Sequence, residues 1–465
     1  MSIFREYDIR GIVGTDLTPE LAERIGRAYA TLGKENHLQT IAVGRDGRLT
    51  SPLMREHLVK GLTEGGLDVL DIGLCATPLL YFSLYHRDVD GGIMITGSHN
   101  ASEYNGFKLC IGKEALYGAG IQRLRSLVEG ESFTVGAGKV IDSPIIPEYL
   151  DYLKNDFSSL KANSLHVVID CGNGAASLVA KQALEQLGCQ VTGLYCELDG
   201  GFPNHHPDPT VVENLEDLRN MVKQVGADVG IGYDGDADRI GAIDEQGNIL
   251  WGDRLLLLFA RDVLVDRPGS TFISEVKASQ HLYDDIEKRG GRGIMWKTGH
   301  SVIKAKMKEE NAVLAGEMSG HMFFADRYFG FDDAIYASCR LIEILAKTKK
   351  PLSSLLLDVP STSVTPEIRV DCPDHQKFVL MHRVIDHISL LAKEPHPNNS
   401  QLNILDVSTI DGIRVRFQDG WGLIRASNTQ PALVLRFEAS TPERLTVLRN
   451  FLESQLAACR QELGI

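Results

Sequence analysis

The chain has 465 residues, and at roughly 100 to 200 residues per domain it is expected to form about three or four domains rather than one core. Hydrophobic residues make up 43% and charged residues 24%, which excludes disordered, collagen-like and coiled-coil chains. The formal net charge of −14 makes nucleic acid and anionic membranes poor partners, although the same field should repel a small phosphorylated ligand.

The sequence also lacks the usual signs of export and membrane insertion. No apolar run approaches the ~20 residues that span a bilayer, and four charges stand in the first ten residues, where a secretory signal would need an apolar run. We therefore expect a soluble, cytoplasmic protein without a membrane partner. The eight cysteines are scattered with no zinc-site spacing, so we expect free, buried thiols.

Segments of strand character alternate with helical segments over the first three quarters of the chain. A first unit has strand candidates at 40–46, 68–73 and 90–97, with helices at 51–64 and from Thr77. The second unit has strands at 166–174, 189–195 and 228–234 and helices at 175–187 and 214–225. The third has a strand at 271–276 and helices at 252–265, 279–288, 301–310 and 332–347. This alternation predicts mixed, largely parallel sheets covered by helices.

The last hundred residues have a different pattern, typical of a smaller α+β unit. The expected elements are a strand at 367–372, a long helix at 374–393, strands at 403–409, 412–418 and 432–440, and a terminal helix at 441–462. We therefore predict three α/β domains and one C-terminal α+β domain. Their boundaries are predicted at 1–147, 148–248, 249–360 and 361–465.

The densest chemical signal is the acidic segment DGDADR, which contains Asp234, Asp236 and Asp238. Three carboxylates so close together repel one another unless a cation holds them, and a set of oxygens favours Mg²⁺. The spacing also resembles a calcium EF-hand, but Arg239 stands where that loop needs glycine and the flanks are strand-like. We expect a turn between two strands with converging carboxylates; a solvated acidic turn is the alternative.

Nucleotide-binding patterns are absent or misplaced. Residues 230–235 satisfy G-x-G-x-x-G, but a strand follows where a dinucleotide fingerprint must open a helix. The nearest approach to a Walker loop, at 106–113, has the wrong spacing between its glycines. The sequence therefore gives no support to a dinucleotide-binding enzyme or a common kinase.

A second cluster, TGSHN, contains Ser98 directly after a buried strand candidate, where open α/β sheets bind ligands. A serine needs a base or a metal to become a nucleophile. Lys108 is expected on the same loop and can transfer protons if nearby cations lower its pKa. The alternatives are an ordinary turn serine and a surface lysine.

Two further polar segments offer hydrogen-bond donors. RASNTQP, which begins at Arg425, combines a guanidinium, hydroxyls and an amide suited to a phosphate dianion; a polar hairpin loop is the alternative. GEMSGH at 316–321 is similar to loops that hydrogen-bond sugar hydroxyls. The adjacent His205 and His206 face opposite ways in an extended segment, so we interpret them as structural.

Taken in chain order, FREYDIRG, TGSHN, DGDADR, GEMSGH and RASNTQP resemble the α-D-phosphohexomutase family, in its phosphomannomutase/phosphoglucomutase branch. The resemblance covers essentially the whole chain. It implies four domains around a central cleft and interconversion of hexose 6-phosphate and hexose 1-phosphate, with mannose and/or glucose as the sugar. It also implies an enzyme phosphoserine and a hexose 1,6-bisphosphate, which serves as intermediate and activator. Small phosphorylated sugars would be the partners, and the chain would be a monomer or weak homodimer.

The same resemblance assigns roles to individual residues. Ser98 would carry the phosphoryl group and, with Asp234, Asp236 and Asp238, would hold one Mg²⁺ per chain. Lys108, with His99 nearby, matches the general acid/base position, and Arg10 and Arg239 match arginines of the transfer site. The residues implied to bind the sugar and its second phosphate are Lys277, His300, Glu317, Ser319, His321, Arg425, Ser427, Asn428 and Thr429.

Several alternatives remain open at this point. Met318 favours the mannose and glucose branch over a phosphoglucosamine mutase, whose loop usually resembles E-Q-S. A non-catalytic sugar-phosphate binding protein and a metal-dependent phosphatase are the other possibilities. Ala237 stands where the family frequently has glycine, and we expect only a stiffer backbone. If the assignments hold, Arg10, Lys108, Arg239, Lys277 and Arg425 must converge on one cleft despite the overall negative charge.

Overall fold

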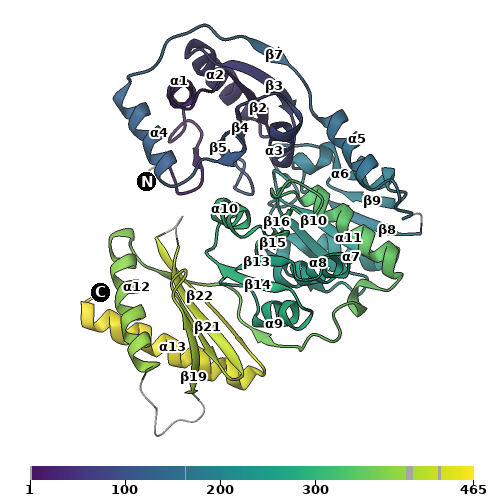
Figure 1. Ribbon diagram of the computed structural model, residues 1–465, viewed down its shortest axis with the longest axis vertical. Coiled ribbons are helices and arrows are strands. Elements are labelled where there is room, and N and C mark those ends of the chain that lie inside the picture. The colour runs from purple at the N-terminus through teal and green to yellow at the C-terminus, as the bar shows by residue number, and fades with distance from the viewer. Residues whose placement is uncertain (1–2, 163, 394–401, 428–430) are drawn as a thin grey trace.

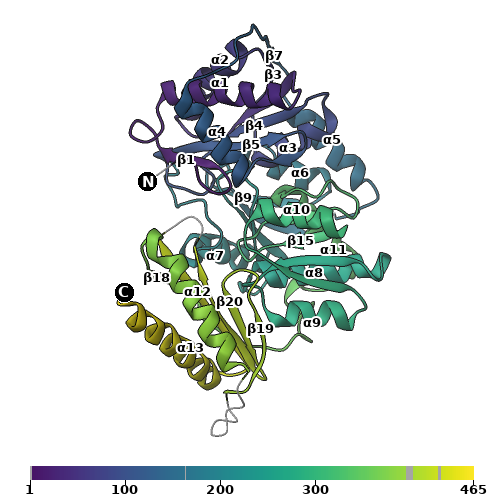
Figure 2. The same ribbon diagram turned by 60° about the vertical axis from the view of Figure 1, so that its left-hand side comes forward.

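The computed structural model describes residues 3–162, 164–393, 402–427 and 431–465. Four sheets follow one another along the chain, each with its own covering helices (Figure 1). In both ribbon views the N-terminal sheet lies at the top and the C-terminal sheet at the lower left (Figures 1 and 2). Among the described residues, no helix is long and apolar enough to cross a membrane.

The first sheet is mixed, with the strand order β1-β5-β4-β2-β3-β7 and β6 paired to β5. Strands β2, β3, β4 and β7 pair in parallel, whereas β5 runs antiparallel to β4 and β1. The strands are β1 (Ile9–Ile12), β2 (Thr40–Arg45), β3 (Asp68–Leu74), β4 (Gly91–Ile95), β5 (Tyr104–Ile111), β6 (Glu114–Ala115) and β7 (Val140–Asp142). The helices are α1 (Pro19–Glu35), α2 (Ser51–Glu64), α3 (Thr77–His86), α4 (Ala119–Gly130) and α5 (Ile146–Asp156).

The second sheet has the order β12-β11-β10-β8-β9, with parallel pairing at β8 and an antiparallel hairpin of β10 and β11. Its strands are β8 (His166–Asp170), β9 (Gln190–Leu194), β10 (Val229–Tyr233), β11 (Ile240–Asp244) and β12 (Ile249–Leu250). Both expected helices begin with a 3₁₀ turn, so the helical segments are η1 (Ala175–Leu178), α6 (Ala180–Gln186), η2 (Val212–Leu215) and α7 (Glu216–Val225).

The third sheet has the order β14-β13-β15-β16. Its strands are β13 (Thr271–Glu275), β14 (Arg292–Trp296), β15 (Leu314–Gly316) and β16 (Met322–Phe324). Its helices are α8 (Gly252–Asp266), α9 (Gln280–Lys288), α10 (His300–Glu310), α11 (Ala334–Thr348) and the 3₁₀ turn η3 (Leu352–Ser354). Helix α11 is buried along almost its whole length because it packs in a large core shared by the first three sheets.

The C-terminal sheet is antiparallel, with the order β17-β22-β21-β20-β19 and β18 paired to β22. Its strands are β17 (Ser363–Val364), β18 (Ile368–Asp371), β19 (Ile404–Ser408), β20 (Ile413–Phe417), β21 (Gly420–Ala426) and β22 (Ala432–Ala439). Helices α12 (Asp374–Leu391) and α13 (Pro442–Leu463) help to form a separate core. A small apolar cluster of Val276, Trp421 and Leu423 joins this unit to the third sheet.

The structure confirms the fold class, three α/β units and one α+β unit, and corrects two local expectations. Strand β21 was not expected, because Gly420 and Gly422 weaken its strand pattern. Both glycines are required by packing: a side chain on Gly420 would meet the carbonyl of Glu438, and one on Gly422 would meet Leu452. Lys108 lies on β5 and not on a loop as expected, so its backbone is fixed by pairing with β4.

Candidate active site

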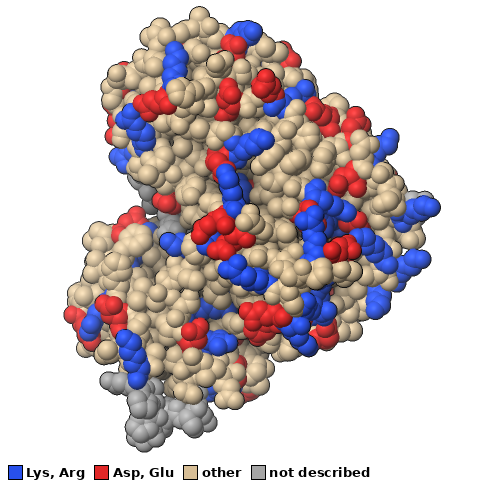
Figure 3. Space-filling view, viewed as in Figure 1, with Lys and Arg blue, Asp and Glu red and all other residues tan. Residues whose placement is uncertain are grey.

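The described parts of all four units line one cavity of about 670 Å³. Its lining includes the five cationic residues expected to converge, namely Arg10, Lys108, Arg239, Lys277 and Arg425. Among the described residues the lining has eight Lys and Arg side chains against four Asp and Glu, although the chain as a whole is acidic. Figure 3 shows acidic and basic side chains interspersed on one outer face, whose left edge is indented between the upper and lower parts.

Ser98 lies in the loop between β4 and β5 and points into this cavity. Its backbone is left-handed, with a φ of 51°, a conformation that costs a non-glycine residue about 1–2 kcal/mol. A hydrogen bond within the loop stabilises this conformation, since the Ser98 amide donates to Thr96 Oγ1 at 2.8 Å. The Ser98 hydroxyl lies 3.1 Å from Nδ1 of His99 and 3.3 Å from Oδ2 of Asp234.

Arg48, which sequence reasoning missed, holds the serine loop from behind. Its fully buried guanidinium donates to the carbonyls of Ser98, Asn100, Ala101 and Tyr104 at 2.6–3.0 Å. Asp46 lies 3.2 Å from its Nε and offsets the charge. One guanidinium group with several N–H donors therefore fixes the loop that carries Ser98.

The acidic segment forms the predicted turn between two strands, β10 and β11. Asp234, Asp236 and Asp238 are fully buried, and one oxygen from each lies within 4.8 Å of the other two. Ala237 has a φ of 61°, which explains why glycine suits this position. The Asp238 and Arg239 amides donate to Asp234 Oδ1 at 3.1 Å, so the turn is closed by its own first carboxylate.

Charge within the turn is only partly compensated by protein groups. Burial and the neighbouring Asp236 and Asp238 raise the pKa of Asp234 well above its usual value. Burial alone would raise the pKa of Asp236, but the Lys108 ammonium at 2.7 Å outweighs it and the pKa is lowered. Lys108 also contacts Asp238, and these carboxylates raise its pKa although burial opposes them. Lys108 was expected to transfer protons only if nearby cations lowered its pKa, and in the structure the neighbouring carboxylates raise it instead.

The residues present fit a hard divalent cation. Among the described residues, Asp236 Oδ1 and Asp238 Oδ1 are buried without a hydrogen-bond partner. Unpartnered carboxylate oxygens are costly in a protein interior, and an all-oxygen donor set is the one that Mg²⁺ prefers. Ser98 Oγ beside Asp234 places a phosphate on that serine within reach of the same ion.

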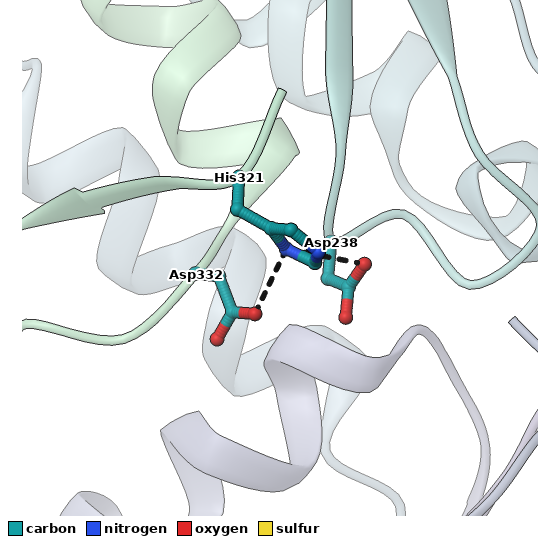
Figure 4. A group of neighbouring side chains, drawn as sticks. All are labelled: Asp238, His321 and Asp332. Carbon is teal, nitrogen blue, oxygen red and sulfur yellow. Dashed lines mark ion pairs between the residues drawn. The ribbon is translucent and has the colours of Figure 1, made fainter. Parts of the chain in front are cut away.

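A second acidic group adjoins the turn and consists of Asp238, His321 and Asp332 (Figure 4). His321 Nδ1 lies 3.0 Å from Asp332 Oδ2 and 3.6 Å from Asp238 Oδ1, while its Nε2 accepts from Arg239 at 3.0 Å. Lys304 pairs with Asp332 at 3.0 Å. Burial would raise the pKa of Asp332, but Lys304 and His321 hold it well below its usual value. Lys304 and Arg239 therefore offset part of the charge of this group, although Asp238 Oδ1, Asp332 Oδ2 and His321 Nδ1 are buried without a hydrogen-bond partner among the described residues.

Two further groups expected at the transfer site lie beside Ser98. Arg10 on β1 donates to Asn100 Oδ1 at 2.6 Å and pairs with Asp8, so it is tied to the serine loop. Burial, together with Arg239 and Arg10, lowers the pKa of His99 well below its usual value. His99 is therefore a neutral imidazole at neutral pH.

The expected sugar-binding residues come from the third unit. Glu317, Ser319 and His321 lie on the tight turn between β15 and β16, where Gly320 has a φ of 93°. Glu317 Oε1 accepts from the Gly299 amide at 2.8 Å, next to His300 at the start of α10. Lys277 follows β13 and lies 3.4 Å from Glu275 and 3.3 Å from Glu367. All five of the expected residues line the cavity: Lys277, His300, Glu317, Ser319 and His321.

The C-terminal unit contributes the opposite wall of the cavity. Arg425 stands near the end of β21 and donates to Asp411 Oδ2 at 3.0 Å, and the buried Ser427 follows it. Both residues line the cavity. Asn428 and Thr429, the other two residues expected here, lie outside the described part of the chain.

Besides Arg48, two supporting residues were missed. Thr77 donates its hydroxyl to Asp236 Oδ2 at 2.5 Å, and Asp332 orients His321. Arg48 could have been predicted from the sequence, because the segment DGR that contains it follows directly after β2, and the carboxyl ends of parallel strands gather at one edge of a sheet. Thr77 carries no comparable local signal, since it acts on Asp236, far away in the chain.

Four family models match the chain in succession. They describe phosphoglucomutase/phosphomannomutase alpha/beta/alpha domain I at residues 1–133, domain II at 147–247, domain III at 251–362 and the C-terminal domain at 367–454. The matches follow the order of the four sheets.

Curated proteins and solved structures are similar over nearly the full length. A phosphomannomutase/phosphoglucomutase of Pseudomonas putida is 46% identical over 464 residues, covering 100% of this chain and 97% of that protein. A phosphoglucomutase of Neisseria gonorrhoeae is 44% identical, covering 96% and 95%. A crystal structure of a phosphoglucomutase/phosphomannomutase family protein from Burkholderia thailandensis has a TM-score of 0.91 at 38% identity, covering 99% and 98%. The chain therefore belongs to the phosphoglucomutase/phosphomannomutase family.

Proposed function

We propose that the protein is a phosphohexomutase that interconverts hexose 6-phosphate and hexose 1-phosphate, with mannose and/or glucose as the sugar. One observation carries the proposal: a single cavity is lined by a strained serine, by Arg239 at the end of the carboxylate turn, by a sugar-type loop and by cationic residues of another unit. The printed names of the relatives support the same activity. A pure binding protein or a phosphatase is not favoured, because neither needs a nucleophile facing a second anion site.

Ser98 is the residue that carries the phosphoryl group between the two ends of the sugar. In the first half-reaction a sugar hydroxyl attacks phosphorus, the bond between phosphorus and Ser98 Oγ breaks, and the proton of the sugar hydroxyl is transferred to Ser98 Oγ, which becomes a free serine hydroxyl. His99, neutral and 3.1 Å from Ser98 Oγ, is placed to exchange a proton with that oxygen. The ammonium of Lys108 and the guanidinium groups of Arg10 and Arg239 offset the phosphate charge and can donate to its oxygens.

Asp234, Asp236 and Asp238 would hold one Mg²⁺ per chain, together with an oxygen of the phosphorylated Ser98. When bound, the ion supplies neutralisation of the charge on the phosphoryl group. The chain itself holds the serine loop in place, because Arg48 donates to the Ser98 carbonyl and the Ser98 hydroxyl donates to Asp234 of the turn.

The bisphosphate formed in the first half-reaction must turn so that its other phosphate faces Ser98. Arg425 and Ser427 line the cavity from a different unit and would form a separate anion site that can hold whichever phosphate is not in transfer. The same logic accounts for hexose 1,6-bisphosphate as activator, because it can return a phosphoryl group to an unmodified Ser98. Glu317 and Ser319 are placed to bind sugar hydroxyls in either orientation.

The proposal also covers the domain boundaries, the location, the oligomeric state and the sugar preference of the protein. We place the domain boundaries at 1–147, 148–248, 249–360 and 361–465, close to the ends of the family matches. We also propose a cytoplasmic location and a monomer or weak homodimer. A preference for glucosamine phosphate is the second candidate within the family, and Met318 favours mannose and glucose over it.

The decisive experiment combines intact mass with an activity assay. We expect the native protein to carry one phosphoryl group, and Ser98→Ala to lose both that mass and at least about 1,000-fold in kcat, because the nucleophile is gone. Ser102→Ala in the same loop is the matched control and should retain both. Full mutase activity in Ser98→Ala would exclude the proposed role.

Sugar preference and metal dependence are tested with the same preparation. Mannose 1-phosphate, glucose 1-phosphate and glucosamine 1-phosphate are compared side by side with Mg²⁺ and a trace of glucose 1,6-bisphosphate. We expect turnover of mannose or glucose phosphate to exceed that of glucosamine phosphate, and chelation by EDTA to abolish it. Asp236→Asn should remain inactive when Mg²⁺ is restored, because one of the three carboxylates is missing.

A further inference from the structure

Two cysteines outside the described site lie in direct contact. Cys171 follows β8 and Cys196 follows β9, and their sulfur atoms are 3.3 Å apart. All eight cysteines are free, and Cys196 is the partly exposed one whereas the other seven are buried. A buried thiol touching a more accessible one is the arrangement found in redox-sensitive pairs.

The two thiols are chemically distinct. The hydrogen bond from Cys171 lowers the pKa of Cys196, which favours its thiolate. The same hydrogen bond, together with burial, raises the pKa of Cys171 well above its usual value. The accessible sulfur is therefore the better nucleophile, and the buried one is positioned to react with whatever forms on it.

The loops that follow the two cysteines reach both halves of the active site. After Cys171, the Ala175 amide donates to the Gly235 carbonyl of the carboxylate turn at 2.9 Å. After Cys196, Leu198 fills the space beside Gly47, next to Arg48 of the serine-loop support.

The two loops also bind each other. Asn173 Nδ2 donates to the Glu197 carbonyl at 2.8 Å, and the Asp199 amide donates to the Asn173 carbonyl at 3.0 Å. A displacement of the two cysteines can therefore be transmitted through these contacts to the groups that hold Ser98 and the three carboxylates.

We propose that Cys171 and Cys196 form a dithiol that hydroperoxides oxidise to a disulfide, and that closing this bond slows phosphoryl transfer. The Cys196 thiolate attacks the terminal peroxide oxygen, the O–O bond breaks, and Cys196 becomes a sulfenic acid while the peroxide leaves as water or an alcohol. Cys171 then attacks the Cys196 sulfur, water leaves, and the S–S bond forms. The two thiols are oxidised by two electrons and the peroxide is reduced by two.

The slowing of catalysis follows from the distance that the sulfurs must travel. A disulfide bond is about 2.05 Å long, so the sulfur atoms must approach from 3.3 Å by more than an ångström. The loops that carry them must shift with them, and displacements of that size at a phosphoryl-transfer site lower the rate.

The test treats the purified full-length protein with hydrogen peroxide, alkylates the remaining thiols and measures intact mass and linked peptides. We expect two free thiols to disappear, a Cys171–Cys196 linked peptide to form, kcat to fall several-fold, and dithiothreitol to reverse all three changes. Cys196→Ser should keep its kcat under peroxide. Cys189→Ser, a buried cysteine of the same unit, is the matched control and should respond like the native protein.

Three outcomes would overturn the proposal: a disulfide between other cysteines, sulfinic acid at Cys196 without a disulfide, or a Cys171–Cys196 disulfide with unchanged kcat. If Cys196→Ser folds poorly, Cys171→Ala provides the same test from the buried side. Thiol counts and masses need no sugar substrate, so their result does not depend on whether the proposed mutase activity is correct.

Discussion

The strained backbone of Ser98 depends on the residues that hold its loop in place. The left-handed backbone of Ser98 persists only because hydrogen bonds hold the surrounding loop in this conformation, and most of them come from Arg48. The guanidinium is completely buried and paired with Asp46, so its donors cannot be replaced by water. Gly97 has no side chain for a related reason, since a Cβ there would meet the Arg48 guanidinium at 2.6 Å.

We expect Arg48→Lys to lower kcat about tenfold or more and to destabilise the fold by roughly 2–4 kcal/mol. A lysine keeps the charge, but its compact ammonium cannot donate to all four carbonyls that the Arg48 guanidinium binds. The carbonyls without a donor stay buried. The measurements are steady-state kinetics and thermal unfolding. Arg55→Lys, in the partly exposed Arg55–Asp71 pair away from the serine loop, is the control and should lower kcat less. Unchanged kcat in Arg48→Lys would show that the serine loop keeps its conformation without the guanidinium group.

Local sequence pattern is sufficient to predict some elements and insufficient for others, for physical reasons. The acidic turn is predictable because continuous apolar runs, β10 and β11, flank it, and three carboxylates so close together repel one another unless a cation holds them. Strand β21 is missed because its glycines are selected by the packing of β22 and α13, which no local window contains. Lys108 is misplaced on a loop because its strand lies between β4 and the distant β1, and the pairing with β1 is not visible in the local sequence.

Helix α11 shows how one element positions part of the site from its N-terminus. Asp333 caps the helix by accepting from the amides of Ile335 and Tyr336, and it also accepts from the hydroxyls of Tyr149 and Tyr328. The next residue, Ala334, donates its amide to the Ala237 carbonyl in the carboxylate turn. Burial nevertheless outweighs these hydrogen bonds and raises the pKa of Asp333 to about 6.

We expect Asp333→Asn to remove a measurable part of the pH dependence of stability. Because the folded pKa lies above the unfolded value of about 3.9, the native state binds this proton more tightly, and ionisation between about pH 4 and 6 costs stability of the order of 3 kcal/mol. Asparagine keeps a cap acceptor and cannot ionise. The thermal midpoint of the variant should therefore gain on that of the native protein as pH rises from 4 to 7.

The matched control is Asp151→Asn on the exposed face of α5, which removes one negative charge elsewhere. A difference between native protein and Asp333→Asn that stays constant from pH 4 to 7 would contradict the argument, since it would mean that the cap is lost without any contribution from ionisation.

Across the molecule, the acidic charge and the cationic cavity are compatible because they occupy different places. The cavity gathers cations from every unit, whereas acidic groups elsewhere are interspersed with basic ones (Figure 3). The first three units share one large core, but the C-terminal unit has its own and meets them through a small apolar cluster. Hydrogen bonds add to this cluster, among them Ser279 to Glu438 at 2.7 Å and Thr298 to Asp411 at 3.1 Å. Arg414 makes two more of them.

Arg414 projects from β20 across this junction. Its buried guanidinium donates to the carbonyls of Val276 and Ala278, the residues on either side of Lys277, and stacks 3.8 Å from the Trp421 ring centre. Burial lowers its pKa to about 10, so it stays charged at neutral pH. One side chain thus ties the unit that carries Arg425 to the segment that carries Lys277.

We expect Arg414→Met to raise KM for the sugar phosphate and to lower kcat/KM by about tenfold, or about 1.4 kcal/mol, while lowering kcat less. Methionine fills much of the apolar volume but cannot donate to the two carbonyls, so Lys277 and Arg425 lose their fixed separation and the phosphate far from Ser98 is bound less well. Arg416→Met on the exposed face of the same strand is the control and should leave both constants unchanged. An equal fall in kcat with unchanged KM would instead place the effect of Arg414 on the transfer step, because a loosened C-terminal unit must weaken binding before it slows chemistry.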